Sequence, residues 1–83
     1  MNPTVFFVDD DTFLLDMYSL KFSKSGYDVK VSTSPDDAIK RLREGFTPDI
    51  LLLDVVMPGM DGIELLGLIR KEKLIPNAVI IML

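Results

Sequence analysis

The stretch Ile50–Gly62 reads ILLLDVVMPGMDG, and it joins a run of large apolar residues to a carboxylate and then to a Pro/Gly turn. Apolar residues that follow one another without alternation are typical of a strand buried on both faces, as in a parallel sheet covered by helices. Asp54 then stands at the carboxyl end of this strand. Because ligands bind at that edge of open α/β sheets, Asp54 is a candidate functional residue.

A second acidic cluster follows the first predicted strand. Thr4–Val8 is β-branched and aromatic, as strands are, and it runs directly into Asp9, Asp10 and Asp11. A plainer interpretation is that Asp11 caps a helix and that Asp9 and Asp10 belong to a solvated loop. The second acidic loop, at Asp54, favours a functional site.

These carboxylates suggest a metal site. If the two strands are neighbours, Asp9, Asp10 and Asp54 meet at one sheet edge, where they repel one another unless a cation lies among them. A few carboxylates, a backbone carbonyl such as that of Val56 and several waters suit Mg²⁺, completed by a phosphoryl oxygen. Mn²⁺ would also fit.

Composition sets further bounds. The chain has 83 residues, 48% of them hydrophobic, a mean hydropathy of +0.30 and a net charge of −4. It contains no Cys and no His, which excludes disulfides, thiolate metal sites and imidazole catalysis. The acidic balance argues against direct nucleic-acid binding. The apolar runs are too short to cross a bilayer and no signal peptide is evident, so we expect a cytoplasmic protein.

Strands and helices alternate along the chain in the order β-α-β-α-β-α-β, which predicts an α/β fold with a parallel sheet and right-handed crossovers. The predicted strands are residues 4–8, 28–32, 49–53 and 78–83, and the predicted helices begin at 12, 35 and 61 or 62. Residues 28–32 alternate like an edge strand, whereas 78–83 form another unalternating apolar strand, typical of burial on both faces.

The predicted first helix runs to about Ser25, with Asp11 or Thr12 as its cap. Leu15, Tyr18 and Phe22 would share its inward face, widened by Leu14 and Met17. Ser34 and Pro35 are a typical start for the second helix, and Asp37 is its approximate capping-box partner.

Three stretches resemble the receiver (CheY-like) domain of bacterial two-component response regulators. They are VDDD at Val8–Asp11, LLDVVMPGMDG at Leu52–Gly62, and Pro76–Leu83. The resemblance implies a flavodoxin-like fold, in which a five-stranded parallel sheet is flanked by helices. Residues 1–83 would form one truncated receiver domain that lacks the last strand and two helices.

The resemblance also implies roles for individual residues. Asp54 would be the phosphoacceptor, Asp10 a direct Mg²⁺ ligand, Asp9 a ligand acting largely through water, and the Val56 carbonyl a further ligand. The donor would be a histidine kinase or phosphotransfer protein of a two-component phosphorelay. The chain would not be an enzyme beyond weak self-catalysed transfer and hydrolysis. Asp61 is better interpreted as a helix cap than as a ligand.

The family pattern continues past Leu83 with a Ser or Thr after the fourth strand and a Lys after the fifth. Without them we expect impaired switching. The bare edge at Val79–Leu83 would be unpaired, so we also expect self-association, through that edge or by exchange of elements between copies.

Two alternatives remain. One is an inert folding or assembly fragment of a receiver domain that forms an oligomer. The other is a haloacid-dehalogenase-type phosphatase, in which Asp9 is the nucleophile and Asp11 the general acid. Phe13 stands where that family expects Thr or Val, which disfavours the phosphatase.

Overall fold

The computed structural model describes residues 2–83, which form four strands and three helices in strict alternation. In chain order the elements are β1 (Thr4–Val8), α1 (Thr12–Lys24), β2 (Asp28–Ser32), α2 (Pro35–Arg43), β3 (Ile50–Leu53), α3 (Gly62–Lys71) and β4 (Val79–Met82). All neighbouring strands are parallel, in the order β2-β1-β3-β4. The predicted element order and parallel sheet are confirmed. Met1, which the predicted domain includes, lies outside the described residues.

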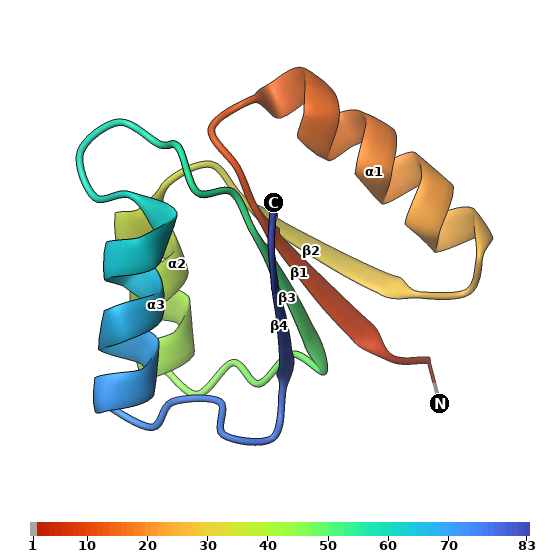
Figure 1. Cartoon of the computed structure of the whole chain (residues 1–83). Helices are drawn as coiled ribbons and strands as arrows, with labels where there is room; N and C mark the ends of the chain where they lie inside the picture. Colours follow the sequence, from red (N-terminus) through yellow and green to blue (C-terminus); the bar gives the residue numbers. More distant parts are fainter. Residues whose placement is uncertain (1) are drawn as a thin grey trace.

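The helices cover the two faces of the sheet unequally. Figure 1 shows α2 and α3 together on one face and α1 alone on the other. The main core lies between the sheet and the α2/α3 pair, with Phe6, Leu51, Leu53 and Leu65 all fully buried. Its remaining buried members are Val8, Ala38, Ile39, Leu42, Met57, Ile69 and Ile75.

The core under α1 is smaller and largely aromatic. The Phe7 ring stacks on Tyr18, with centroids 5.3 Å apart, and lies 5.2 Å from the Phe22 ring. The predicted inward face of Leu15, Tyr18 and Phe22 is therefore confirmed. Met17 is 48% exposed, so its predicted inward position is wrong. At 100° per residue, Met17 lies roughly 130° around the helix from the centre of that face.

The prediction that residues 78–83 are buried on both faces is also wrong. Ile80 and Met82 pack against the main core, whereas Val79 is 59% exposed and Ile81 is 43% exposed. The reason is that α1 packs over β1 and β2, and nothing in residues 2–83 covers the same face of β4. An apolar strand sequence does not report whether a neighbour covers it.

Local capping sets where α2 begins. The Ser34 hydroxyl accepts a hydrogen bond from the Asp37 N–H at 3.1 Å, as predicted for an N-cap. The Asp37 carboxylate does not complete a capping box, because it accepts a bond from the Ser32 hydroxyl at 2.7 Å instead. Asp is one methylene shorter than the Glu that usually reaches back to the cap. Within residues 2–83, none of the helices is long and apolar enough to span a membrane.

Candidate functional site

Backbone hydrogen bonds bring the acidic loops together at the carboxyl edge of the sheet. Strands β1 and β3 are adjacent, with Val8 opposite Leu53. The Asp54 N–H donates to the Val8 carbonyl at 2.9 Å, and the Asp9 N–H donates to the Ser32 carbonyl at 3.1 Å. The ladder thus continues one residue past the strand ends and fixes where both aspartates leave the sheet.

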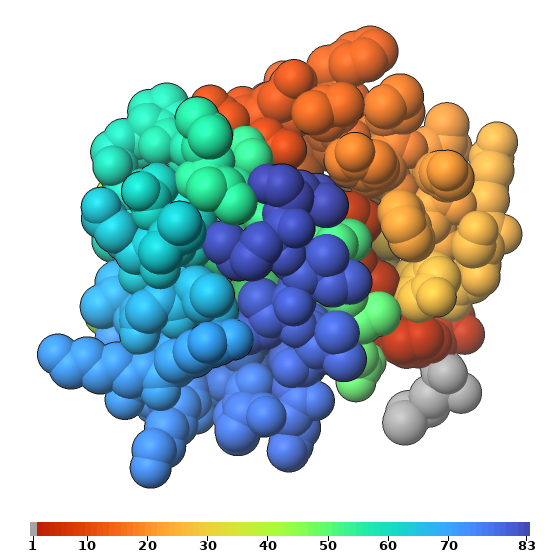
Figure 2. All heavy atoms as spheres, in the orientation of Figure 1, coloured from red at the N-terminus to blue at the C-terminus, as the bar shows by residue number. Residues whose placement is uncertain are grey.

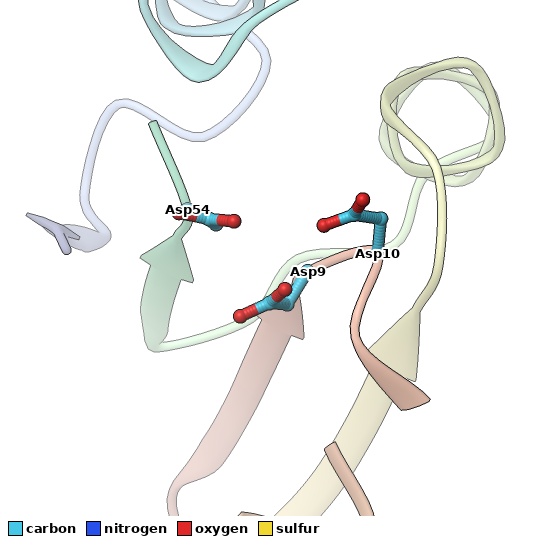
Figure 3. Close-up of side chains that lie close together, drawn as sticks. All are labelled: Asp9, Asp10 and Asp54. Atoms are coloured by element: carbon cyan, nitrogen blue, oxygen red, sulfur yellow. The ribbon is translucent and has the colours of Figure 1, made fainter. Parts of the chain in front are cut away.

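Three carboxylates meet at this edge, as the sequence predicted. One oxygen from each of Asp9, Asp10 and Asp54 lies within 4.8 Å of the other two. Asp9 is only 9% exposed, Asp54 is half-buried and Asp10 is exposed. In Figure 3 the side chains of Asp10 and Asp54 point toward one another, with Asp9 beside them at the end of its strand. Such a cluster is consistent with a metal site.

Short-range hydrogen bonds orient two of these carboxylates. The Asp11 N–H donates to Asp9 Oδ1 at 3.0 Å, and the Val56 N–H donates to Asp54 Oδ1 at 3.3 Å. Within residues 2–83, the second oxygen of each carboxylate accepts no hydrogen bond from the protein. These oxygens are therefore available to a ligand.

The electrostatics of the cluster favour a cation. Burial raises the pKa of the Asp9 carboxyl, the hydrogen bond from Asp11 partly offsets this, and the charges of Asp54, Asp10 and Asp11 raise it further. A cation among the carboxylates would oppose both the burial cost and the repulsion. All the side-chain atoms that could ligate a metal here are carboxylate oxygens, which suits a hard cation such as Mg²⁺. The carbonyl of Val56 as a further ligand stays a prediction.

Two other carboxylates near the site serve as helix caps. Asp11 Oδ1 accepts from the N–H groups of Phe13 at 3.0 Å and Leu14 at 3.3 Å, so Asp11, rather than Thr12, caps α1. Asp61 Oδ1 accepts from the Glu64 N–H at 2.9 Å, which confirms its interpretation as the cap of α3. Neither belongs to the three-carboxylate cluster.

Gly62 holds the start of α3 against the site. Its N–H donates to the Val55 carbonyl at 2.8 Å. A Cβ at this position would overlap the carbonyl oxygen of Asp54 and lie 2.9 Å from the Cα of Val55. Only a residue without a side chain permits this approach.

A supporting network beside the site was not predicted. Ser32 ends β2, is 2% exposed, and donates from its hydroxyl to Asp37 Oδ2. Arg41 in turn pairs with Asp37, with 3.1 Å between Nε and Oδ2. The Ser32 carbonyl at the end of β2 accepts a hydrogen bond from the Asp9 N–H, so this network ties β2, and with it Asp9, to α2. No local pattern signalled it, because Ser32 alternates in step with the exposed Asp28 and Lys30 rather than with Val29 and Val31.

The comparison with known families decides the classification. The family described as the response regulator receiver domain matches residues 5–83. The chain belongs to this family. The receiver is 35% identical over 74 residues to the alkaline phosphatase synthesis transcriptional regulatory protein PhoP of Bacillus subtilis (strain 168), covering 89% of this chain and 30% of that protein.

Solved structures support the flavodoxin-like, CheY-like fold of the receiver. A CheY-like response regulator receiver domain protein from Methanospirillum hungatei JF-1 has a TM-score of 0.89 and 31% identity, over 96% of this chain and 63% of that one. The chemotaxis protein CheY4 of Vibrio cholerae has a TM-score of 0.88 and 26% identity, over 99% and 68%. The receiver spans about a third of the curated relatives it matches.

Proposed function

We propose that this receiver accepts a phosphoryl group on Asp54, with Mg²⁺ held by Asp9, Asp10, Asp54 and the Val56 carbonyl. The observation that carries the proposal is the half-buried position of Asp54 at the end of β3, with a carboxylate oxygen within 4.8 Å of oxygens from both other aspartates. Membership in the receiver family supports it. The proposal places the protein in the cytoplasm and treats it as a phosphoacceptor rather than an enzyme.

Phosphoryl transfer to Asp54 requires little covalent chemistry from the rest of the protein. A carboxylate is ionised at neutral pH and attacks phosphorus without a general base. One oxygen of Asp54 forms the new P–O bond while the P–N bond of a donor phosphohistidine breaks, and the imidazole nitrogen keeps the electron pair of that bond. When bound, Mg²⁺ supplies neutralisation of the charge on the phosphoryl oxygens. Positioning of the nucleophile is then the main task of the chain.

The residues around Asp54 are arranged for that positioning. The Val56 N–H holds one oxygen of the Asp54 carboxylate, so the other oxygen is left to react. The backbone of Asp54 is fixed by β1 on one side and by the close approach of Gly62 on the other. Asp9, being mostly buried, adds negative charge beneath the reacting carboxylate and so favours a cation at that point.

A protein phosphoryl donor fits the surface around the aspartates better than a small-molecule donor does. Exposed apolar side chains stand on the segments that flank the aspartates: Phe13 is 73% exposed at the start of α1, Val56 79% after Asp54, and Ile63 62% at the start of α3. Apolar groups around a polar centre are typical of protein contact surfaces. We therefore assign the donor role to a histidine kinase or phosphotransfer protein.

Intact-protein mass spectrometry after incubation with acetyl phosphate and Mg²⁺ tests the proposal. Wild type should gain one phosphoryl group, Asp54→Asn should gain none, and Asp9→Asn should still be modified, more slowly. Asp36→Asn, an exposed carboxylate on α2, is the matched control and should behave as wild type. Modification that survives Asp54→Asn but is lost in Asp9→Asn would instead support the phosphatase alternative.

An inert assembly fragment of a receiver domain is the alternative to this proposal. It predicts that neither acetyl phosphate nor Mg²⁺ alters the aspartates, while the protein still associates. Phosphorylation of Asp54 in the same sample would exclude it.

A further inference from the structure

The aspartates of the site are attached to strands that differ in their support. Figure 2 shows the loop after β3, in green, next to the chain before α1, in orange, at the top of the molecule. The Asp54 N–H donates to the Val8 carbonyl of β1, a central strand, whereas the Asp9 N–H donates to the Ser32 carbonyl of β2. Among the strands of residues 2–83, β2 pairs only with β1. The position of the Asp9 backbone therefore depends on how firmly the end of β2 is held.

The Ser32 side chain anchors this end of β2 to α2. It is only 2% exposed, and its hydroxyl donates to Asp37 Oδ2 at 2.7 Å. Asp37 is itself fixed, because its N–H donates to the Ser34 hydroxyl at 3.1 Å at the start of the helix. A buried hydroxyl without a partner costs free energy, so Ser32 and Asp37 stabilise one another in place.

Arg41, one turn further along α2, contacts both the helix and the strand. Its Nε lies 3.1 Å from Asp37 Oδ2, the oxygen that also accepts from Ser32, and its Nη1 donates to the Val31 carbonyl at 2.9 Å. The guanidinium carbon lies 5.8 Å from the centre of the buried Phe6 ring of β1, within the range of a cation–π contact. One rigid, planar guanidinium thus connects the last two residues of β2 to α2 and β1.

We propose that Arg41 is a positioning residue for Asp9 and, through Asp9, for the cation site. The path runs from the guanidinium to the Asp37 carboxylate and the Ser32 hydroxyl, and then from the Ser32 carbonyl to the Asp9 N–H. Mg²⁺ demands near-ideal octahedral geometry, so a ligand whose backbone shifts binds it less well. The role at the cation rests on the proposed function, whereas the hold on Asp9 does not.

Arg43 offers a matched control on the same helix. Its Nε and Nη2 donate to Glu72 at 2.9 and 2.6 Å, so it also makes a forked contact, but with the end of α3 rather than with β2. Arg41→Gln and Arg43→Gln each remove one such contact from α2. A difference between the two variants therefore isolates the contact of Arg41 with β2 and Asp37.

Amide hydrogen exchange in metal-free buffer measures the hold on Asp9 directly. Loss of hydrogen bonds at the end of β2 should raise the exchange rate of the Asp9 N–H relative to the Asp54 N–H about tenfold in Arg41→Gln. The same ratio should keep its wild-type value in Arg43→Gln. A general loss of stability would speed the exchange of both amides alike and leave the ratio unchanged.

A Mg²⁺ titration followed by NMR tests the consequence at the cation. The affinity should fall about tenfold in Arg41→Gln and stay at the wild-type value in Arg43→Gln. Ser32→Ala, which removes the buried hydroxyl, should weaken binding as well. The double variant should lose less affinity than the product of the two single losses, because both changes interrupt one path.

The outcomes separate this proposal from the proposed function. An unchanged exchange ratio in Arg41→Gln, unchanged Mg²⁺ affinity in that variant, or equal losses in Arg43→Gln would each overturn the positioning role. A wild type that binds no Mg²⁺ would overturn the proposed function, and hydrogen exchange would still decide whether Arg41 positions Asp9. If Arg41→Gln fails to fold, Arg41→Lys, which keeps the charge but not the fork, and Ser32→Ala decide the question by the same two measurements.

Discussion

The two faces of the sheet differ in how completely they are covered. On the α2/α3 face, β3 and both helices contribute side chains that are fully buried, such as Leu51, Leu53 and Leu65. On the α1 face, Val5 and Phe7 are buried, yet Val79 and Ile81 of the same sheet surface stay exposed. Within residues 2–83, stability should therefore reside mainly in the first face.

The aspartates lie at the carboxyl edge between these faces, and they depend on the well-covered one. Gly62 at the start of α3 touches the backbone of Asp54, and Met57, 6% exposed, anchors the intervening loop in the main core. Geometry at the site should thus respond to changes in α3 and little to changes in β4.

The largest difference in unfolding free energy should appear when an apolar side chain is truncated on each of the two faces. Leu65→Ala removes a fully buried side chain and should cost about 2–5 kcal/mol of unfolding free energy, because it leaves a cavity. Ile81→Ala, at a position 43% exposed, should cost less than about 1 kcal/mol. Urea unfolding followed by circular dichroism measures both. Equal losses would show that the faces contribute equally.

The next largest effect should be a difference in stability and Mg²⁺ binding between alanine variants of two glycines of α3. Gly62→Ala should destabilise by about 1–3 kcal/mol and weaken Mg²⁺ binding, because its Cβ would push the helix away from Asp54. Gly67→Ala meets no atom within 4 Å and should stabilise the helix by roughly 0.5–1 kcal/mol. Thermal unfolding and Mg²⁺ titration of both variants test the difference. Unchanged Mg²⁺ affinity in Gly62→Ala would show that the position of α3 does not affect the cation site.

Local sequence patterns predict some features of this receiver and not others. The order of the elements, the Ser34 cap and the meeting of the aspartates all follow from local signals: turn residues, alternation and carboxylates placed directly after apolar runs. The exposure of Ile81 depends on which helix covers which part of the sheet, and an apolar residue looks the same in either setting. The contact of Arg41 with the β2 edge joins segments distant in sequence, so no local pattern reports it.

A smaller effect is expected at the acidic cluster itself. Asp9→Asn should raise the unfolding free energy by less than about 1 kcal/mol without divalent cations, because it removes a buried charge whose pKa is raised by burial and by Asp54 and Asp10. The same variant should bind Mg²⁺ more weakly. Calorimetry with and without Mg²⁺ measures both changes. Destabilisation of Asp9→Asn in metal-free buffer would mean that the carboxylates are not under repulsion.

The smallest effect concerns the ion pair between the two helices of the well-covered face. Arg43 donates to Glu72 at 2.9 and 2.6 Å, and this hydrogen bonding lowers the pKa of Glu72 below its usual 4.5. The stabilisation is present above pH 4.5 and is lost as the pH falls through the lowered pKa. Glu72→Gln should therefore be slightly less stable than wild type at neutral pH and equal to it in acid. Glu44→Gln, which removes an exposed carboxylate that makes no ion pair within residues 2–83, is the control.

We expect Asp9, Asp10 and Asp54 to form a cation site carried by the α2/α3 side of the fold. A Mg²⁺ titration followed residue by residue by NMR tests this site. Saturable shifts are expected at Asp10, Asp54 and Val56, with weak or absent shifts at Val79 and Ile81, and the shifts should all be lost in Asp54→Asn. No shift at the aspartates at millimolar Mg²⁺, or shifts that persist unchanged in Asp54→Asn, would contradict a cation site at these residues.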